Sequence, residues 1–464
     1  MSTSADLVIL GAGPAGLAAA WRAARNGLSV TVLDRADTVG GMAASFTVGG
    51  VRVDNGSHRL HPVIPPHLLA DLRQLLGDDL QLRRRNGRLR VGDNWVRFPV
   101  RSGELVRALP TGKMLRAASE AITQPLRRSA EANYADVLRS SLGATMYEAV
   151  YEPYARKMWG LSGERVDPTQ AHRRVAADSP WQAAAKIFQP SRDRGARLFY
   201  YPRRGFGQIV ESLAEAATAA GVDIRLGADV DNLAPTVDDV TVSVLGGEQL
   251  VAGQVFSTIP LPILARICRP GPSLSVVEAS SRLRFRAMVL VYAVHEGSRP
   301  WSAYDSHYLP AQSTPIVRIS EPVNYRLSLD DPTDRTVLCC EIPCDFGDQL
   351  WNASDEELAA IVSDTVARLG MPRLNLGWVQ VKRLRHVYPV YEHGYQESLT
   401  GLDSWAASLP RVTTFGRSGL FVHDNTHHAL VMAYDAANSL TEGGFDRRAW
   451  AAARARFDKH VVED

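Results

Sequence analysis

Cysteine is scarce in this sequence. Only four of the 464 residues are cysteine, too few for a disulfide framework in a chain of this length. Three of them lie in Val337–Cys344, without the paired CxxC spacing of a zinc site. We therefore expect buried, reduced thiols at Cys268, Cys339, Cys340 and Cys344, and a reducing, cytoplasmic compartment.

The sequence also has no excess of charge of either sign. Its 52 lysines and arginines nearly balance its 50 aspartates and glutamates, which leaves a formal charge of +2. This balance argues against a nucleic-acid-binding protein, which needs a concentrated basic face. It is compatible with a small anionic ligand, because a local arginine cluster does not show in the net charge.

Long hydrophobic runs are missing as well. No run approaches the roughly 18 apolar residues that a membrane-spanning helix needs. The longest apolar stretch begins at Leu7, and Gly11, Gly13, Pro14 and Gly16 interrupt it. No positively charged segment precedes this stretch, as a signal peptide would require. We therefore expect a protein that does not bind or cross a membrane.

The first forty residues contain a complete dinucleotide-binding pattern. An apolar strand, Leu7–Leu10, leads into a glycine-rich turn and then into an alanine-rich helix that stops at Gly27. A second apolar strand, 28–33, ends at Asp34. This order of strand, glycine turn, helix, strand and acid predicts a Rossmann unit.

Each residue of this pattern has a physical task. Gly11 permits the tight turn, Gly13 lets a pyrophosphate approach the backbone, and Gly16 lets the helix pack against the strand. The helix N-terminus presents unpaired N–H groups to the phosphates. The Asp34 carboxylate accepts hydrogen bonds from ribose hydroxyls, which favours FAD or NAD over NADP.

The segment after Asp34 distinguishes between these two dinucleotides. Gly40-Gly41-Met42 resembles the continuation found in the FAD family typified by glutathione reductase, which includes amine oxidases, carotenoid desaturases, protoporphyrinogen oxidases and UDP-galactopyranose mutases. The resemblance implies FAD rather than NAD. It implies cofactor contacts at Gly11, Gly13, Gly16, Asp34, Gly40, Gly41, Met42, Val230, Gly416 and Asn425.

Two further motifs resemble UDP-galactopyranose mutases. The loop Gly56–His61 is similar to their GxHxFH loop, which implies that His58 and His61 lie beside the flavin ring and exchange hydrogen bonds with it as its redox state changes. Tyr154–Gly160 resembles their Y-x-x-K-x-W-G block, of which protoporphyrinogen-oxidase-like proteins have a version. An arginine after this block grips a diphosphate in the mutases, a role that suits the planar guanidinium fork. The implied substrate-binding residues are Tyr154, Trp159, Arg173, Arg174, Arg318, Tyr325, Tyr391 and Tyr395.

The C-terminal part contains a third resemblance and a departure from it. Gly416–Phe421, followed by Asn425, is similar to the last FAD-binding segment of these families. Where relatives often have N-M-D and then a glycine, this chain has histidines and Ala433, whose side chain is expected to crowd the flavin. We expect no metal site, with the cluster His423, His427 and His428 as a weak alternative.

The predicted fold class is α/β, with a Rossmann-type, glutathione-reductase-like FAD-binding domain and inserted helical and antiparallel β substrate segments. A helix is expected at Ser354–Leu369, with a capping box formed by Ser354 and Glu357. A type I′ hairpin turn is expected at Asn86-Gly87. The predicted segments are three parts of the FAD-binding domain at 1–100, 199–272 and 405–464, a helical insertion at 101–198 and an antiparallel β segment at 273–404.

These observations lead to three hypotheses for function. The first is a flavin-dependent nucleotide-sugar pyranose/furanose mutase, an isomerase in which N5 of reduced FAD attacks the anomeric carbon. The second is an FAD-dependent oxidoreductase that removes hydride, such as an amine oxidase, a protoporphyrinogen-oxidase-like enzyme or a desaturase. The third is a flavin-free nucleotide-sugar-binding or metal-assisted protein on the same scaffold. In each case the partner is a small molecule, and for the mutase it is a nucleotide diphosphate sugar.

Overall fold

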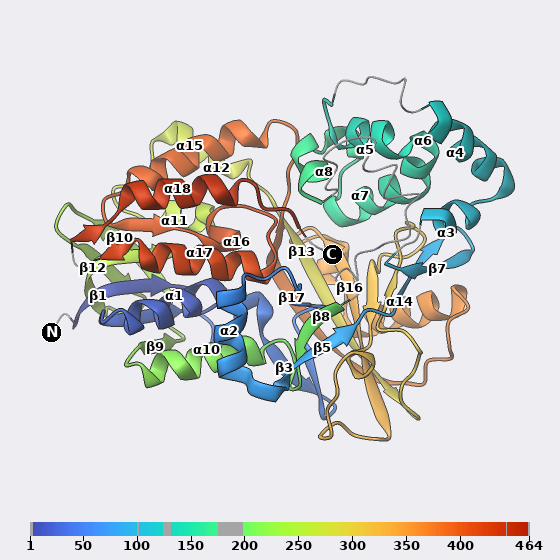
Figure 1. Ribbon diagram of the computed structural model, residues 1–464, viewed down its shortest axis with the longest axis horizontal. Coiled ribbons are helices and arrows are strands. Elements are labelled where there is room, and N and C mark those ends of the chain that lie inside the picture. The colour runs from blue at the N-terminus through green and yellow to red at the C-terminus, as the bar shows by residue number, and fades with distance from the viewer. Residues whose placement is uncertain (1–2, 100–101, 124–130, 175–197, 442, 463–464) are drawn as a thin grey trace.

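The computed structural model describes residues 3–99, 102–123, 131–174, 198–441 and 443–462. It contains two seven-stranded sheets, on the left and on the right of Figure 1, and a group of helices above the second sheet. This mixed architecture confirms the predicted α/β fold class.

The first sheet consists mainly of parallel strands. Its strands are β1 (Thr3–Leu10), β2 (Val30–Asp34), β9 (Asp223–Leu226), β10 (Val230–Pro235), β11 (Val240–Val244), β12 (Gln249–Ser257) and β18 (Val412–Thr414). Their order is β10-β11-β12-β1-β2-β9, and β18 also pairs with β12. Leu7 and Ile9 point into one hydrophobic core, whereas Val8 and Leu10 point into another. Both faces of β1 are therefore buried, which explains its continuous apolar run.

Helices cover both faces of this sheet. They are α1 (Pro14–Arg25), α2 (Pro66–Leu76), α10 (Gln208–Ala219), α11 (Leu261–Ile267), α12 (Leu274–Ser281), α15 (Tyr395–Ser408), α16 (Gly416–Gly419), α17 (Thr426–Asn438) and α18 (Arg447–Phe457). α1, α10 and α17 cover the face of Leu7 and Ile9, and α11 and α15 cover the opposite face. The C-terminal α17 thus returns to the nucleotide-binding unit (Figure 1).

The second sheet is mainly antiparallel. Its strands are β6 (Gly87–Val91), β7 (Asn94–Phe98), β13 (Phe285–Glu296), β14 (Ser306–Tyr308), β15 (Arg318–Ser320), β16 (Arg335–Cys344) and β17 (Leu376–Pro389). They follow the order β17-β13-β16-β15-β14-β6-β7, so the N-terminal segment contributes β6 and β7 to this sheet. α14 (Asp355–Arg368) covers one face, and its predicted capping box of Ser354 and Glu357 is confirmed. The four cysteines are buried free thiols, as expected.

The turn predicted at Asn86-Gly87 is wrong. β5 (Leu80–Arg84) pairs with β8 (Leu198–Pro202), not with β6, and the β6–β7 hairpin turns at Gly92-Asp93 instead. The reason is a partner that is distant in sequence. The N–H of Asn86 donates to the Asp305 carboxylate at 2.8 Å, and this bond ties the chain to β14, which begins directly after Asp305. The smaller pairings are β3 (Ser45–Val48) with β4 (Val51–Asp54) and β19 (Leu440–Thr441) with β20 (Gly444–Phe445).

The helical group comes from one stretch of chain. It contains α3 (Ser102–Arg107), α4 (Thr111–Thr123), α5 (Tyr134–Leu142), α6 (Ala144–Met146), the π-helical turn η4 (Tyr147–Tyr151), α7 (Glu152–Trp159) and α8 (Pro168–Arg174). These helices lie at the upper right of Figure 1. Among the described residues, no helix has the length and apolar character to cross a membrane. The boundaries of the five chain segments stay predictions.

Candidate functional site

A cavity of about 1060 Å³ lies where the two sheets and the helical group meet. The glycine turn before α1 and the start of α17 line one end, and the loop that carries His58 lines the middle. Residues of η4, α7 and the second sheet line the other end. A large cavity at such a junction is the expected place for a cofactor and its substrate.

The glycine turn forms an open cradle. Gly11 has a φ of +109°, which favours glycine, and a Cβ at Gly16 would stand 1.9 Å from the Gly11 carbonyl oxygen. A Cβ at Gly13 would meet no protein atom within 4 Å, since Gly13 faces the cavity. Gly13 is also the N-cap of α1 and contributes no capping side chain, which leaves the first N–H groups of the helix for an anion.

The acid and the second glycine pair are tied to this turn. The Asp34 carboxylate accepts hydrogen bonds from the N–H groups of Ala12 and Ala36, at 2.7 and 2.9 Å, and lines the cavity. Its oxygens have further lone pairs for ribose hydroxyls. Gly40 donates its N–H to the Ala12 carbonyl at 2.8 Å, which brings Gly41 to the cavity wall. Met42 and Val230 line the same cavity.

The C-terminal segment lines the cavity beside the glycine turn. Gly416 has a φ of +81°, and a Cβ there would stand 3.1 Å from the Ala15 Cβ. Asn425 caps α17, and both Gly416 and Asn425 line the cavity. Ala433 is fully buried in the core of the nucleotide-binding unit and does not line the cavity, so the expected crowding of the flavin does not arise. A glycine cradle, an acid and two helix N-termini along one cavity fit a dinucleotide such as FAD.

Of the two predicted flavin-side histidines, only His58 lines the cavity. Its Nε2 lies 3.0 Å from the Asn55 carbonyl, and its ring stacks on Phe206. Burial lowers the pKa of His58, which favours the neutral imidazole. His61 is buried outside the cavity, where its Nδ1 accepts the Val63 N–H at 3.3 Å.

We call the end of the cavity that is lined by η4, α7 and the second sheet the substrate end. It contains two of the residues predicted to bind substrate, Tyr154 and Arg318. Arg318 forms a mostly buried ion pair with Glu341 at 2.8 Å. This ion pair holds the loop that carries His58 through both backbone polar groups of Ser57. Glu341 accepts the Ser57 N–H at 2.8 Å, and Arg318 donates to the Ser57 carbonyl at 3.2 Å.

Sequence reasoning missed several other residues of this wall. They share a place on the substrate side of the cavity and are Arg85, Tyr134, Tyr151, Tyr308 and Tyr388. Tyr151 lies one helical turn before Tyr154, a spacing that places two side chains on one face and is visible in the sequence. The other four lie in separate elements, and no local pattern connects them.

The remaining predicted substrate residues do not lie with Tyr154. Arg173, Tyr391 and Tyr395 line a second, smaller cavity of about 190 Å³, in which the two tyrosine rings stack 4.3 Å apart. Trp159 is buried and makes T-shaped ring contacts with Tyr388 and with His423.

Two more predicted residues are accounted for by their surroundings. Tyr325 packs edge-on against Tyr201 and does not line the cavity. Arg174 ends α8, and its side chain lies outside the described residues. Hydrophobic and aromatic packing thus accounts for the places of Trp159, Tyr325, Tyr391 and Tyr395, and their role as substrate ligands stays a prediction.

Lys157 of the same sequence motif joins the helical group to the second sheet. Its Nζ donates to the carbonyl oxygens of Leu309 and Ile316, at 2.5 and 3.0 Å. Both acceptors belong to the chain between β14 and β15. Buried polar groups of this kind fix the position of packed elements, because each would be unsatisfied if they separated.

We expect the stability of the protein to rise with pH because of Lys157. Burial lowers the pKa of Lys157 from its ordinary value of 10.5 to about 7. Between these two pH values the unfolded chain therefore holds more protons than the folded chain, and the free energy of unfolding increases with pH. Urea unfolding from about pH 7 to about pH 10 should show this slope in the wild type and less of it in Lys157→Met. The exposed Lys113→Met serves as the control, and an equal slope in Lys157→Met would contradict the prediction.

The geometry agrees with comparisons to known proteins. The model of the family of flavin-containing amine oxidoreductases matches residues 14–434. The chain belongs to this family. The prediction of FAD as cofactor is confirmed by this membership, and the glycine cradle, Asp34 and the two helix N-termini are the groups that would hold it.

Curated relatives match only part of their own length. A phytoene dehydrogenase of Streptomyces griseus is 28% identical over 287 residues, which cover 56% of this chain and 55% of that protein. The chain matches about half the length, or less, of its curated relatives.

Solved structures show the fold. A reduced UDP-galactopyranose mutase aligns with a TM-score of 0.82 at 20% identity, over 99% of this chain and 100% of that one. A putrescine oxidase with bound putrescine aligns with a TM-score of 0.66 at 19% identity, over 94% and 99%. Family membership therefore identifies the chain as a flavoenzyme.

Proposed function

We propose that this flavoenzyme is a mutase that interconverts the pyranose and furanose forms of a nucleotide diphosphate sugar. The observation that carries the proposal is the continuity of the main cavity. Beyond its dinucleotide end, the same space is lined by Tyr134, Tyr151 and Tyr154 and by Arg85 and Arg318. Aromatic rings and guanidinium groups are the two kinds of side chain that recognise a base and a diphosphate.

The tyrosines are suited to hold the base. Tyr151 and Tyr154 are half-buried and lie one turn apart, where η4 passes into α7. A planar base stacks on such rings whatever its hydrogen-bond pattern. Burial raises the pKa of Tyr151, so its hydroxyl stays protonated and neutral at physiological pH.

The arginines are suited to hold the diphosphate. Arg85 lies between β5 and β6 and lines the cavity, while the Arg318 guanidinium is fixed by Glu341 and the Ser57 carbonyl. A fixed guanidinium loses little conformational freedom when it binds an anion. In the reduced state, FAD supplies a nucleophilic N5 for the anomeric carbon. The residues of this chain position the sugar: the neutral His58 lies in the middle of the cavity, where it adds no charge beside the sugar.

A second function has its own support. Apolar side chains also line the substrate end, as an oxidoreductase of an apolar substrate requires: Leu89, Phe98, Leu105, Val150, Met158, Leu309 and Val317. The phytoene dehydrogenase relative is consistent with such a substrate. Family membership favours both flavin-dependent hypotheses over the flavin-free one.

One experiment distinguishes the two flavin reactions. FAD-loaded protein, reduced with dithionite under anaerobic conditions, is incubated with UDP-galactopyranose and a panel of other nucleotide hexoses, and isomers are separated by chromatography. The mutase proposal expects an isomer that appears only with reduced protein. The mutase proposal fails if the reduced protein neither binds nor isomerises any of these nucleotide hexoses. Hydride transfer from an amine or a polyene to the oxidised protein would establish the oxidoreductase.

We expect Tyr154→Ala to weaken nucleotide binding. Loss of one stacking ring costs about 1–3 kcal/mol per base, which raises the Kd for UDP by about 5- to 150-fold. The control is Arg156→Ala on the same helix, because Arg156 is exposed and contacts Glu152 rather than the cavity. Calorimetric titration of UDP into both variants measures the difference, and equal affinities would contradict the role of Tyr154.

A further inference from the structure

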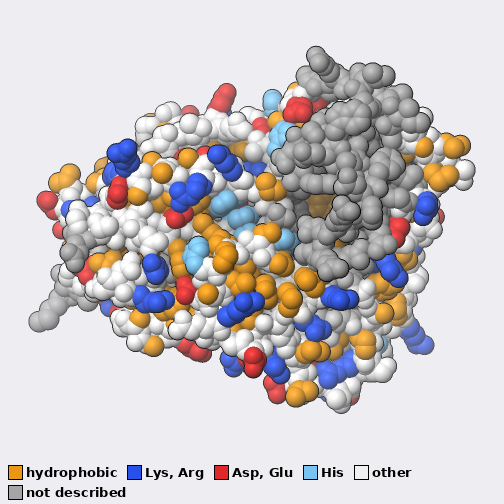
Figure 2. Space-filling model, in the orientation of Figure 1, with side chains coloured by type: hydrophobic (Ala, Val, Ile, Leu, Met, Phe, Trp, Pro, Cys, Tyr) orange, Lys and Arg blue, Asp and Glu red, His pale blue; other side chains and the backbone are white. Residues whose placement is uncertain are grey.

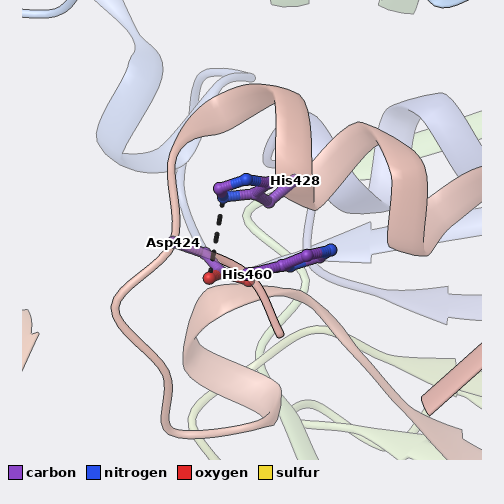
Figure 3. A group of neighbouring side chains, drawn as sticks. All are labelled: Asp424, His428 and His460. Atoms are coloured by element: carbon purple, nitrogen blue, oxygen red, sulfur yellow. Dashed lines mark hydrogen bonds and ion pairs between the residues drawn. The ribbon is translucent and has the colours of Figure 1, made fainter. Parts of the chain in front are cut away.

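A cluster of titratable side chains adjoins the flavin end of the main cavity. Asp424 precedes α17, His428 lies in its first turn, and His460 follows α18 near the C-terminus (Figure 3). Asp424 lines the main cavity, and its side chain is only 1% exposed. His460 Nδ1 lies 3.1 Å from Asp424 Oδ2, and His428 Nδ1 lies 3.7 Å from Asp424 Oδ1.

The arrangement of the rings argues against a metal ion at this cluster. The rings of His428 and His460 stack with centroids 4.1 Å apart and an interplanar angle of 14°. An imidazole binds a metal ion along a nitrogen lone pair, which lies in the plane of the ring. A single ion cannot lie in the planes of two rings that are stacked in parallel at this distance. His428 Nδ1 also accepts the Asn425 N–H at 3.2 Å, and the Arg173 guanidinium lies 4.0 Å from Asp424. The weak alternative of a metal at His423, His427 and His428 is therefore not supported either, since His423 Nε2 lies 2.7 Å from the Pro389 carbonyl.

The charges around the cluster single out one histidine. Burial and neighbouring His427, His460 and Arg173 lower the pKa of His428 to about 2, so that it stays neutral. Burial, with His61 and His460, lowers the pKa of His427 to about 4. His460 alone of the three rings contacts the Asp424 carboxylate within hydrogen-bond distance, and 14% of its side chain is exposed.

We propose that Asp424 and His460 form a redox-linked proton-binding site, which takes up a proton from solvent when the flavin in the adjoining cavity is reduced. The step uses two electrons from a reductant such as dithionite and two protons from solvent. One proton is taken up by the flavin ring, which leaves one added negative charge in the cavity. The other goes to the Nε2 of His460, whose Nδ1–H donates to Asp424. The added negative charge in the cavity and the added positive charge on the ring stabilise each other across the carboxylate.

The two faces of the site suit this exchange. The carboxylate side meets the cavity, and the His460 side meets solvent. Histidine side chains gather near the centre of the face in Figure 2, in the region where Figure 1 places α16 and α17. Among the described residues, the other charged or titratable groups around the site are Arg173, His61, His427, His428 and Tyr391, and all are present in every variant below. The inference depends on the flavin and not on the identity of the substrate.

The test is a redox titration of FAD-loaded protein at a series of pH values from about 5.5 to about 8.5, the range in which histidine titrates. In the wild type, uptake of this extra proton should increase the equilibrium constant for reduction by up to about tenfold for each unit by which the pH is lowered, within the pH range where the site takes up its proton. His460→Gln should lose this extra dependence and be harder to reduce at low pH only. Asp424→Asn should move the window to lower pH, because it removes the partner of the protonated ring.

The exposed His393→Gln is the matched control and should titrate like the wild type. Circular dichroism and the flavin spectrum verify that each variant is folded and loaded. If His460→Gln keeps the wild-type pH dependence, the proposal is overturned. It is also overturned if the wild type retains one zinc per chain after incubation with zinc chloride and dialysis, and His460→Gln retains none.

Discussion

Gly16→Ala should produce a protein that neither retains FAD nor folds its N-terminal unit correctly. The added Cβ would stand 1.9 Å from the Gly11 carbonyl oxygen, and this neighbour is backbone in the turn itself. α1 and β1 must therefore separate, in a region where Leu17 and Ile9 are fully buried. Overpacking of this kind costs about 3 kcal/mol or more. Thermal unfolding and the ratio of flavin to protein absorbance measure the two losses.

Gly13→Ala is the informative comparison. Its Cβ meets no protein atom within 4 Å, and its φ of −82° suits any residue, so the fold should keep its stability. The same methyl group projects into the space where a pyrophosphate approaches the backbone, so we expect the Kd for FAD to rise at least about tenfold. Gly112→Ala at the start of α4 also meets no neighbour and should change neither property. A Gly16→Ala protein that is as stable as Gly13→Ala would show that the helix does not pack as described.

The dinucleotide end of the site was predictable because its determinants are local. Gly11, Gly13, Gly16 and Asp34 act within one strand–turn–helix–strand unit. The backbone requires Gly11 and Gly16, Gly13 leaves space for the pyrophosphate, and the acid follows at the strand end. The capping box of α14 was predictable for the same reason. Short-range patterns leave few alternative structures.

The substrate end was only partly predictable because its partners are distant in sequence. Tyr391 and Arg173 resemble substrate ligands in the sequence, yet stacking on Tyr395 and proximity to Asp424 place them at a second cavity. Asn86 looks like a turn residue until its bond to Asp305 is seen. Such long-range contacts decide which polar and aromatic side chains reach a cavity, and no spacing along the chain encodes them.

The same distinction holds for the histidines. The sequence grouped His423, His427 and His428 because they are close in the chain. The structure groups His428 with Asp424 and with His460, which comes from beyond α18, and neither His423 nor His427 belongs to this group. His423 instead lies against the Pro389 carbonyl and the Trp159 ring. The cluster inferred from neighbours in sequence thus shares His428 with the group in the structure and lacks His460, which is distant in sequence.

Arg318→Met should destabilise the protein by about 3–5 kcal/mol, since it leaves the Glu341 carboxylate buried without its countercharge. Glu341 is only 3% exposed, and within the described part of the chain the donor that remains to it is the Ser57 N–H. The double variant Arg318→Met/Glu341→Gln should recover most of this stability. Its amide oxygen still accepts the Ser57 N–H, and no charge is left buried. Urea unfolding of the two variants measures the difference.

The double variant then separates folding from function. It keeps the His58 loop in place but lacks a guanidinium at the substrate end, so under the mutase proposal it should retain FAD and bind UDP more weakly than the wild type. Arg335→Met is the control for the charge itself, because its ion pair with Asp334 is exposed and such pairs contribute little to stability. Wild-type affinity for UDP in a folded double variant would mean that Arg318 serves only to hold the loop, and the diphosphate would then have to bind at Arg85.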